Sequence, residues 1–472
     1  MFTQRIAVPP FARLVLLFIL LVSSSIGARA QQAEVDNIRQ ALTNAVTTLK
    51  GAPPQYGTFI DIKAIDRQNR WAFGTIVLLT PTNQDAQDGF EQLPEGFIWL
   101  AQKTGSSWGI ALEYTPTFLD WVPNVPSEVL NTELKQLFLS ARDSKSTQSF
   151  ANNVSTLAAG DPSGDLALPW WPGQAWNLRG GPHPWTGCSN NVCPRPWSSI
   201  DLNGGDGRVL AARRGTALRM CGNSTWMRVI HEGGWATDYY HIINLAVADN
   251  TSVEYLRYLG DIGTAIGCGG SASSPHVHFA IRLNGAYIEW NGREIGGWTV
   301  YEGGTGYQGR VERGYVGGNT VVNVNNNVYN IGVQYQAHVQ NIGWQPAQAN
   351  GGTAGTVGQN LRMEAINISL MKPTGTPGNV DICYEAHVQN IGWQGERCNA
   401  QTAGTIGQSL RIEAIKIRLV NPPNRAGVCY RAYVEGIGWQ PWYCNNAVAG
   451  TTGQGRRLEA LQILITPGSL SP

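Results

Sequence analysis

The sequence is poor in charge and in long apolar runs, and both shortages exclude classes of function. Only 14% of its 472 residues are charged, and 34 basic residues nearly balance 33 acidic ones. Such a balance gives no electrostatic footprint for nucleic acid or for an acidic membrane surface. No segment reaches the run of about 20 apolar residues that a membrane-spanning helix needs, so we expect no membrane span.

Three catalytic signatures are also missing from the chain. It contains no His-Glu-x-x-His, no Gly-x-Ser-x-Gly and no Cys-x-x-Cys. These absences argue against a helix-based metalloprotease, a nucleophile-elbow hydrolase and a thiolate zinc site. Glycine (56 residues) and tryptophan (17 residues) are abundant instead, which favours glycine-turned β modules over a helical protein. The length predicts about three domains, mainly β.

The first 30 residues have the pattern of a secretion signal. Arg5 and Arg13 precede the apolar run 14–22, and Ala28-Arg-Ala30 offers a small-residue cleavage site. The run is too short to cross a bilayer. We therefore expect an exported protein that is released outside the cell.

Residues 31–160 contain neither cysteine nor histidine. Apolar positions at helical spacing predict a helix over 35–49, alternation predicts strands near 58–64 and 71–79, and Pro126 suits the first turn of a helix over 126–140. This pattern indicates a small α+β domain, followed by a linker rich in small polar residues over 144–164. Our interpretation is a pro-domain that assists folding or keeps the following domain inactive; the alternative is a retained binding domain.

The C-terminal third consists of three internal repeats, over 328–376, 377–422 and 423–472. The motif Tyr-x-Ala-His/Tyr-Val-x-x-Ile-Gly-Trp recurs and ends at Trp344, Trp393 and Trp439. Each copy is followed by Gly-x-x-Gly-Gln and a Glu-Ala segment. In repeat two, the apolar alternation of this segment slips by one residue between Ala414 and Ile415, as a β-bulge would cause. We expect a β domain of three units, for which a pseudo-threefold arrangement is natural.

All eight cysteines lie beyond residue 187, and an even number in an exported chain indicates disulfides. Repeats two and three each carry a cysteine before the Tyr and another after the Trp, whereas repeat one has Gln334 and Ala349 there. Because repeat one lacks both cysteines together, the two cysteines of each other repeat are expected to be bonded to each other. The remaining four cysteines then pair most simply with their neighbours in sequence. The predicted disulfides are Cys383–Cys398, Cys429–Cys444, Cys188–Cys193 and Cys221–Cys268.

Five of the seven histidines lie between residues 183 and 278. His276 and His278 share one face of a strand, because side chains alternate every two residues. Short β-like runs and many glycines surround them, so 165–305 is expected to be an antiparallel β domain. Two imidazoles on one face, with His183, His231 and His241 upstream, indicate a metal site. A hydrolytic zinc site needs about three protein ligands and an open position for water.

Four blocks of this region, in this order, resemble the lysostaphin-type zinc endopeptidases, and most of all their beta-lytic or staphylolysin branch. The blocks are Gly180-Gly-Pro-His183, Ser198-Ser-Ile-Asp201, Trp235-Ala-Thr-Asp-Tyr-Tyr-His241 and Ser274-Pro-His-Val-His-Phe279. They cover roughly residues 168–300.

The resemblance implies an antiparallel β fold with one zinc ion. It implies the zinc ligands His183, Asp201 and His278, with His241 and His276 as catalytic histidines that assist water activation and stabilise the oxyanion. His183 and Asp201 are farther apart in sequence than in much of the family, and the intervening loop holds Cys188 and Cys193. Asp206 is the rival ligand, although its Gly-Gly-Asp-Gly context is typical of a turn.

The repeats resemble the clostridial hydrophobic repeats with a central Gly-Trp, which implies attachment to a cell surface or macromolecule. Trp344, Trp393 and Trp439 could stack on a polymer or fill a core. His338 and His387 correspond to Tyr433 in repeat three, which favours an aromatic hydrogen-bonding group over a metal ligand. His231 is expected to support structure more than chemistry.

Together these features predict a secreted, monomeric zinc endopeptidase that cuts glycine-containing peptides of peptidoglycan and is held at a cell-surface polymer by its repeats. One alternative is a protease of secreted or matrix proteins. Another is a catalytically inactive wall-binding protein, against which the presence of all five matched site residues argues.

Overall fold

The computed structural model describes most of the chain and divides it into two compact units, 1–79 with 95–135 and 80–94 with 136–472. The described residues are 32–66, 68, 70–81, 93–143, 166–188, 192–222, 225–313, 321–322, 327–373, 379–422 and 426–466. The expected signal sequence and linker lie outside these ranges. No helix within the described ranges is long and apolar enough to cross a membrane.

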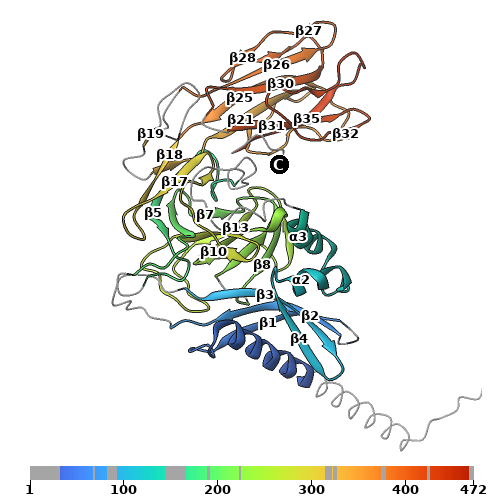
Figure 1. The fold of residues 1–472 in the computed structure, drawn as a ribbon. Coiled ribbons are helices and arrows are strands. Elements are labelled where there is room, and N and C mark those ends of the chain that lie inside the picture. The colour runs from blue at the N-terminus through green and yellow to red at the C-terminus, as the bar shows by residue number, and fades with distance from the viewer. Residues whose placement is uncertain are drawn as a thin grey trace, which may run out of the picture. The chain divides into compact units, whose positions relative to one another are not determined.

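The first unit is built on a four-stranded antiparallel sheet in the order β1-β2-β3-β4, drawn in blue in Figure 1. A helix over 32–50 packs on it, because Ile38, Leu42 and Val46 share a core with Trp99 of the sheet. The predicted helix and the first two predicted strands are confirmed. The strands are β1 (Thr58–Ile65), β2 (Trp71–Leu78), β3 (Glu95–Thr104) and β4 (Ser107–Leu112).

Short helical elements follow this sheet: α2 (Pro116–Trp121), η1 (Val122–Asn124) and α3 (Thr132–Asp143). The predicted start of α3 at Pro126 is wrong. Residues 127–129 form a turn instead, in which the N–H groups of Val129 and Leu130 donate to the Pro126 carbonyl. The helix begins only after Asn131, whose side chain accepts the N–H of Leu134 at 2.8 Å and caps the first turn.

The histidine-rich region forms a nine-stranded, antiparallel sheet in the order β12-β8-β9-β10-β14-β6-β5-β20, with β15 beside β14. Its apolar side chains pack with those of two smaller sheets, β11-β13-β7 and β16-β17-β18-β19. This agrees with the expected antiparallel β domain. The strands are β5 (Ala175–His183), β6 (Ser199–Gly204), β7 (Arg208–Leu210), β8 (Gly215–Arg219), β9 (Met227–Ile230), β10 (Trp235–Tyr240), β11 (Ile242–Ile243), β12 (Thr251–Val253), β13 (Tyr258–Ile262), β14 (Val277–Leu283), β15 (Ala286–Tyr287), β16 (Glu294–Ile295), β17 (Trp298–Glu302), β18 (Gly309–Arg313), β19 (Val321–Val322) and β20 (Asn327–Tyr329), with the short helix η4 (Glu232–Gly234) before β10.

Each repeat is a long antiparallel hairpin with short strands at its edges. The long pairs are β21 (Gly332–Val339) with β25 (Met363–Met371), β26 (Asp381–Val388) with β30 (Ile412–Val420), and β31 (Gly427–Val434) with β35 (Leu458–Thr466). The bulge predicted in repeat two is present, and the other two repeats have it as well, because the register shifts at Glu364, Glu413 and Glu459. The short strands are β22 (Gly343–Trp344), β23 (Gln348–Ala349), β24 (Ala354–Gly355), β27 (Gly392–Trp393), β28 (Arg397–Cys398), β29 (Ala403–Gly404), β32 (Gly438–Trp439), β33 (Tyr443–Cys444) and β34 (Ala449–Gly450).

The three repeats exchange strands in a closed cycle. Strand β29 of repeat two pairs with β25 of repeat one, β34 of repeat three pairs with β30 of repeat two, and β24 of repeat one pairs with β35 of repeat three. A buried tyrosine follows the same cycle, since Tyr384, Tyr430 and Tyr335 each accept a backbone N–H from the neighbouring repeat. All three repeats contribute to one apolar core, as the predicted three-unit β domain requires.

Candidate metal centre and active site

Three neighbouring strands place the three expected metal ligands together. His278 lies on β14 directly opposite Asp201 on β6, and His183 ends β5, the next strand of the sheet. The β5–β6 register is irregular from Leu178 to His183. Glycine is needed at 180, because a Cβ there would approach Asp201 Oδ2 to 2.4 Å.

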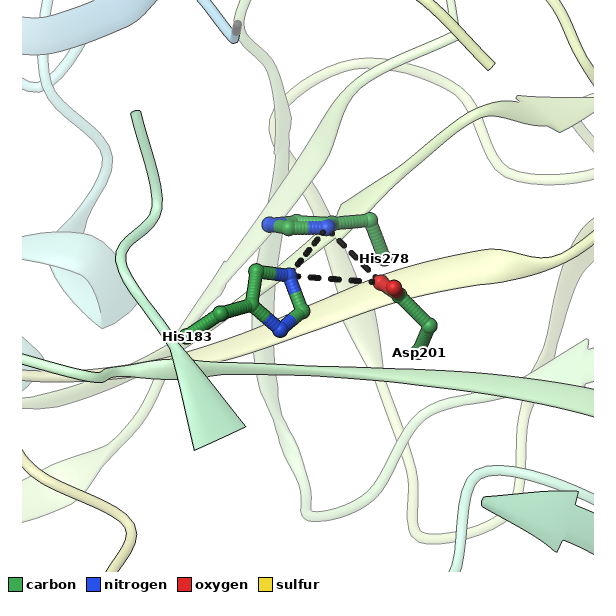
Figure 2. Close-up of side chains that lie close together, drawn as sticks. All are labelled: His183, Asp201 and His278. Carbon is green, nitrogen blue, oxygen red and sulfur yellow. Dashed lines mark hydrogen bonds and ion pairs between the residues drawn. The ribbon is translucent and has the colours of Figure 1, made fainter. Parts of the chain in front are cut away.

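The ligand atoms of these residues converge on one point, as Figure 2 shows. Asp201 Oδ1 lies 2.9 Å from His278 Nδ1 and 3.5 Å from His183 Nε2. The two histidine nitrogens are 3.3 Å apart. All three residues are buried, and their ligand atoms lie within 4.8 Å of one another. Asp206 lies in a turn, where its carboxylate accepts the N–H of Arg208.

The two expected catalytic histidines lie beside this cluster. The His241 and His276 rings are 4.9 Å apart, and His276 Nε2 lies 3.7 Å from Asp201 Oδ1. His241 follows β10, which pairs with β14 so that Tyr240 faces His278. Its φ of 62° is unusual for a residue other than glycine, and such backbone conformations concentrate at functional sites.

Backbone carbonyls orient three of the four imidazoles in the site. His183 Nδ1 lies 2.7 Å from the Gly181 carbonyl, His241 Nδ1 lies 3.0 Å from that of Ala265, and His276 Nδ1 lies 2.7 Å from that of Ser274. Because only an N–H can donate to a carbonyl, the proton of each neutral ring is on Nδ1. Each Nε2 therefore presents a lone pair, as a metal ligand or a general base needs.

The donor set fits a zinc ion. Two neutral imidazoles and one carboxylate are a common ligand combination of catalytic zinc, which leaves the fourth position to water or substrate. His183, Asp201 and His278 would hold the ion. The pairing of Nδ1 of His183 with a carbonyl supplies the outer hydrogen bond that usually fixes a zinc-binding histidine.

Two aromatic residues that the motifs do not identify complete the surroundings. Tyr307 stacks on His183 with ring centroids 3.8 Å apart, and it lies two residues beyond the expected end of the domain. Trp185 contacts His278 edge-on at 5.0 Å and stacks on Tyr287 at 5.1 Å. In the sequence, only the position of Trp185 two residues after His183 suggests that it belongs to the site.

Asp238 of β10 accepts hydrogen bonds from three side chains, one of which, Tyr287, stacks on Trp185. Arg228 donates from two nitrogens at 2.8 and 3.1 Å, Trp226 donates at 2.9 Å and Tyr287 at 3.2 Å. Arg228 and Asp238 are both inaccessible to solvent. This buried ion pair fixes β10 three residues before His241.

His231 is buried in a structural hydrogen-bond chain and is not part of the His-Asp-His cluster. One ring nitrogen pairs with the Arg214 carbonyl at 2.8 Å and the other with Thr237 Oγ1 at 2.9 Å. Burial, with a smaller contribution from Arg213, lowers the pKa of His231 to about 3. It is therefore neutral at physiological pH.

In the repeats, the aromatic residue before each Gly-Trp packs on that tryptophan. The ring pairs His338–Trp344, His387–Trp393 and Tyr433–Trp439 are edge-on at 5.4, 5.3 and 5.5 Å. His338 and His387 also contact the bulged carboxylates Glu364 and Glu413 at 3.1 and 3.3 Å. The four disulfides of the structure are Cys188–Cys193, Cys221–Cys268, Cys383–Cys398 and Cys429–Cys444.

Comparison with known proteins gives two kinds of match. The family model "Clostridial hydrophobic W" matches residues 338–372, 387–421 and 433–467. Protease LasA of Pseudomonas aeruginosa is 33% identical over 171 residues, which are 34% of this chain and 38% of that protein. The beta-lytic metalloendopeptidase of Lysobacter enzymogenes is 29% identical over 165 residues, 33% of this chain and 89% of that protein.

A solved structure described as a novel M23 metalloprotease, pseudoalterin, is 30% identical and aligns with 35% of this chain and 97% of that one, at a TM-score of 0.30. The chain thus spans well under half of LasA and most of the shorter relatives. With the four motif blocks and the His-Asp-His cluster, the sequence matches make the histidine-rich region similar to LasA and the beta-lytic enzymes, which are lysostaphin-type zinc metalloendopeptidases, and the C-terminal region carries clostridial hydrophobic W repeats.

Proposed function

We propose that this protein is an exported zinc endopeptidase that hydrolyses glycine-containing peptides of peptidoglycan. The observation that carries the proposal is the convergence of His183, Asp201 and His278 beside two oriented histidines. One zinc ion per chain fits this cluster. Export is supported by the four disulfides, since such bonds persist in oxidising compartments.

Bound zinc would polarise the scissile carbonyl and lower the pKa of a water molecule. The protein's own contribution lies at Nε2 of His241 and His276. In the neutral ring this atom accepts a proton from the attacking water. In the protonated ring it donates to the oxyanion or to the leaving amine. The carbonyls of Ala265 and Ser274 keep both rings in the required tautomer.

The choice of glycine-rich peptidoglycan rests on the family resemblance, and cell-surface attachment rests on the repeats. The turn before each Trp344, Trp393 and Trp439 exposes an isoleucine: Ile342, Ile391 and Ile437 are 51%, 50% and 51% exposed. An apolar side chain kept half exposed at three equivalent positions supports a binding surface. Three linked contacts would add avidity for a repetitive polymer.

The test is hydrolysis of pentaglycine by the full chain and by chain processed near residue 160, with zinc measured in the same samples. We expect turnover with about one zinc per chain, abolished by chelation. His278→Ala should lose zinc and activity. His241→Ala should keep zinc and lose activity about 100-fold or more. His387→Gln, a histidine change outside the site, should alter neither.

Zinc without pentaglycine turnover would reject the glycine-rich substrate and leave another peptide bond as the target. A processed protein that binds no zinc would reject the proposal altogether.

A further inference from the structure

The connection between β2 and β3 belongs physically to the histidine-rich unit. Residues 80–94 join two strands of the first unit, yet they cluster with residues 136–472. The described ends of this connection, Thr80–Pro81 and Leu93–Pro94, both touch the surroundings of the metal cluster. They do so through main-chain atoms.

The first contact is at Trp185. Its indole Nε1 donates to the Pro94 carbonyl at 2.7 Å. The same indole lies against His278, a ligand of the metal cluster, at 5.0 Å. Leu93 and Trp185 are only 1% and 2% exposed, so this hydrogen bond is shielded from water and correspondingly strong.

The second contact is at Gly269 and Gly270, in the loop that precedes β14. The Gly270 amide donates to the Pro81 carbonyl at 3.2 Å. At Gly269, a Cβ would come within 2.4 Å of the Thr80 carbonyl oxygen, so the chains are in close backbone contact. The Gly269 carbonyl in turn accepts the hydroxyl of Tyr240, whose ring lies 4.5 Å from that of His241.

The chain's own peptide groups therefore occupy one donor beside a metal ligand and one donor beside a catalytic histidine. An extended peptide substrate presents the same main-chain carbonyls, whatever its side chains. A glycine-rich peptide has almost no side chains, so its main-chain groups are nearly all that an enzyme can recognise. The contact with Gly269 needs an absent Cβ on the enzyme side, which suits recognition of backbone at close range.

We propose that the Trp185 indole N–H and the Gly270 amide bind main-chain carbonyls of the peptide substrate, and that residues 80–81 and 93–94 occupy both donors until they are displaced. This inference rests on the proposed peptidase function. It makes Trp185 and Gly270 substrate-positioning groups. It also makes residues 80–81 and 93–94 competitors of the substrate in the intact chain.

The decisive variant shortens the connection and keeps the rest of the chain. Leu78 and Glu95 are direct partners in the β2–β3 pair, so an Asn-Gly turn can replace residues 79–94 without changing the register. The matched control keeps Thr80, Pro81, Leu93 and Pro94 and replaces only 82–92 with a Gly-Ser sequence of equal length. We expect the shortened chain to cleave pentaglycine at least about 10-fold faster than the intact chain at low substrate, and the control to match the intact chain.

The role of the indole is tested within the shortened chain by Trp185→Phe, which keeps an aromatic ring and removes the N–H. We expect KM to rise about 3- to 10-fold, the usual effect of one hydrogen bond, with kcat within about twofold. Trp197→Phe is the control, because Trp197 also donates to a carbonyl, that of Cys193 at 3.0 Å. It should change neither constant. Equal effects of the two substitutions would overturn the assignment of Trp185.

A readout that needs no turnover separates this inference from the proposed function. In ¹⁵N-tryptophan-labelled protein carrying His241→Ala, the Trp185 indole resonance should shift when the connection is shortened. It should shift again when pentaglycine is added. If these shifts are observed but the protein with an intact His241 does not cleave pentaglycine, the result contradicts only the proposed function. An indole resonance that is the same in the intact and shortened chains would overturn the inference.

Discussion

The buried His231 should make the protein lose stability on acidification, and a single substitution should remove much of that loss. Burial lowers the pKa of His231 to about 3, from an ordinary value of 6.5. In the unfolded chain the ring takes up a proton below pH 6.5, whereas the folded protein resists protonation until about pH 3. The contribution of His231 to stability is therefore complete above pH 6.5 and is lost as the pH falls toward 3.

At pH 4.5 the unfolded ring is almost fully protonated and the folded ring almost fully neutral. Two pH units below the unfolded pKa correspond to about 2 to 4 kcal/mol of lost unfolding free energy. The structural reason is specific: a charged His231 would lie near Arg213, and its Nε2 could no longer accept a hydrogen bond from Thr237.

The assay is urea unfolding at pH 7.5 and 4.5 for the natural chain and for His231→Gln. The glutamine side chain does not titrate, so this variant should be less stable at pH 7.5 but should lose about 2 to 4 kcal/mol less on acidification. Metal release at low pH affects both proteins and cancels in the difference. Equal losses in the two proteins would show that His231 is protonated in the folded state and would refute the reasoning.

Three further outcomes are expected. Asp238→Ala should destabilise the fold by about 3 to 5 kcal/mol in urea unfolding, because it leaves the buried Arg228 charge uncompensated; a loss under about 1 kcal/mol would contradict this. Gln334→Cys with Ala349→Cys should form a third repeat disulfide, seen by mass under non-reducing conditions, since these residues are paired as Cys383 and Cys398 are; the bond should add up to about 3 kcal/mol. Replacing Ile342, Ile391 and Ile437 together with Ser should weaken sedimentation with cell walls at least about 10-fold and leave cleavage of soluble pentaglycine unchanged; undiminished sedimentation would remove these residues from the proposed surface.

The parts of the molecule that could be predicted from the sequence are those with internal repeats or with alternating apolar and polar residues. Comparison of the three repeats identified the disulfides Cys383–Cys398 and Cys429–Cys444, because repeat one lacks both cysteines. The slip in apolar alternation within repeat two predicted the bulge. Alternation placed His276 and His278 on one face of a strand, and the motif blocks supplied His183 and Asp201.

What it could not predict depends on contacts between distant segments. Pro126 has the right chemistry for a first helical turn, but Asn131 provides the cap, and α3 begins at the next residue, Thr132. Tyr307 and Trp185 have no periodicity that marks them, and their roles appear only once β5 and β14 share a sheet. The hydrogen bond from Trp185 to Pro94 joins residues 91 positions apart, a separation that no local pattern encodes.

The closed exchange of strands among the repeats has a consequence for how this domain can change in length. In an open array, a unit can be gained or lost at the end, and the remaining neighbours are undisturbed. Here repeat one returns a strand to repeat three, so there is no end at which to add or remove a copy. Loss of one copy would strip a partner from each survivor and expose two sheet edges. Variation in such a domain should therefore proceed by whole triplets or by substitution within the ring.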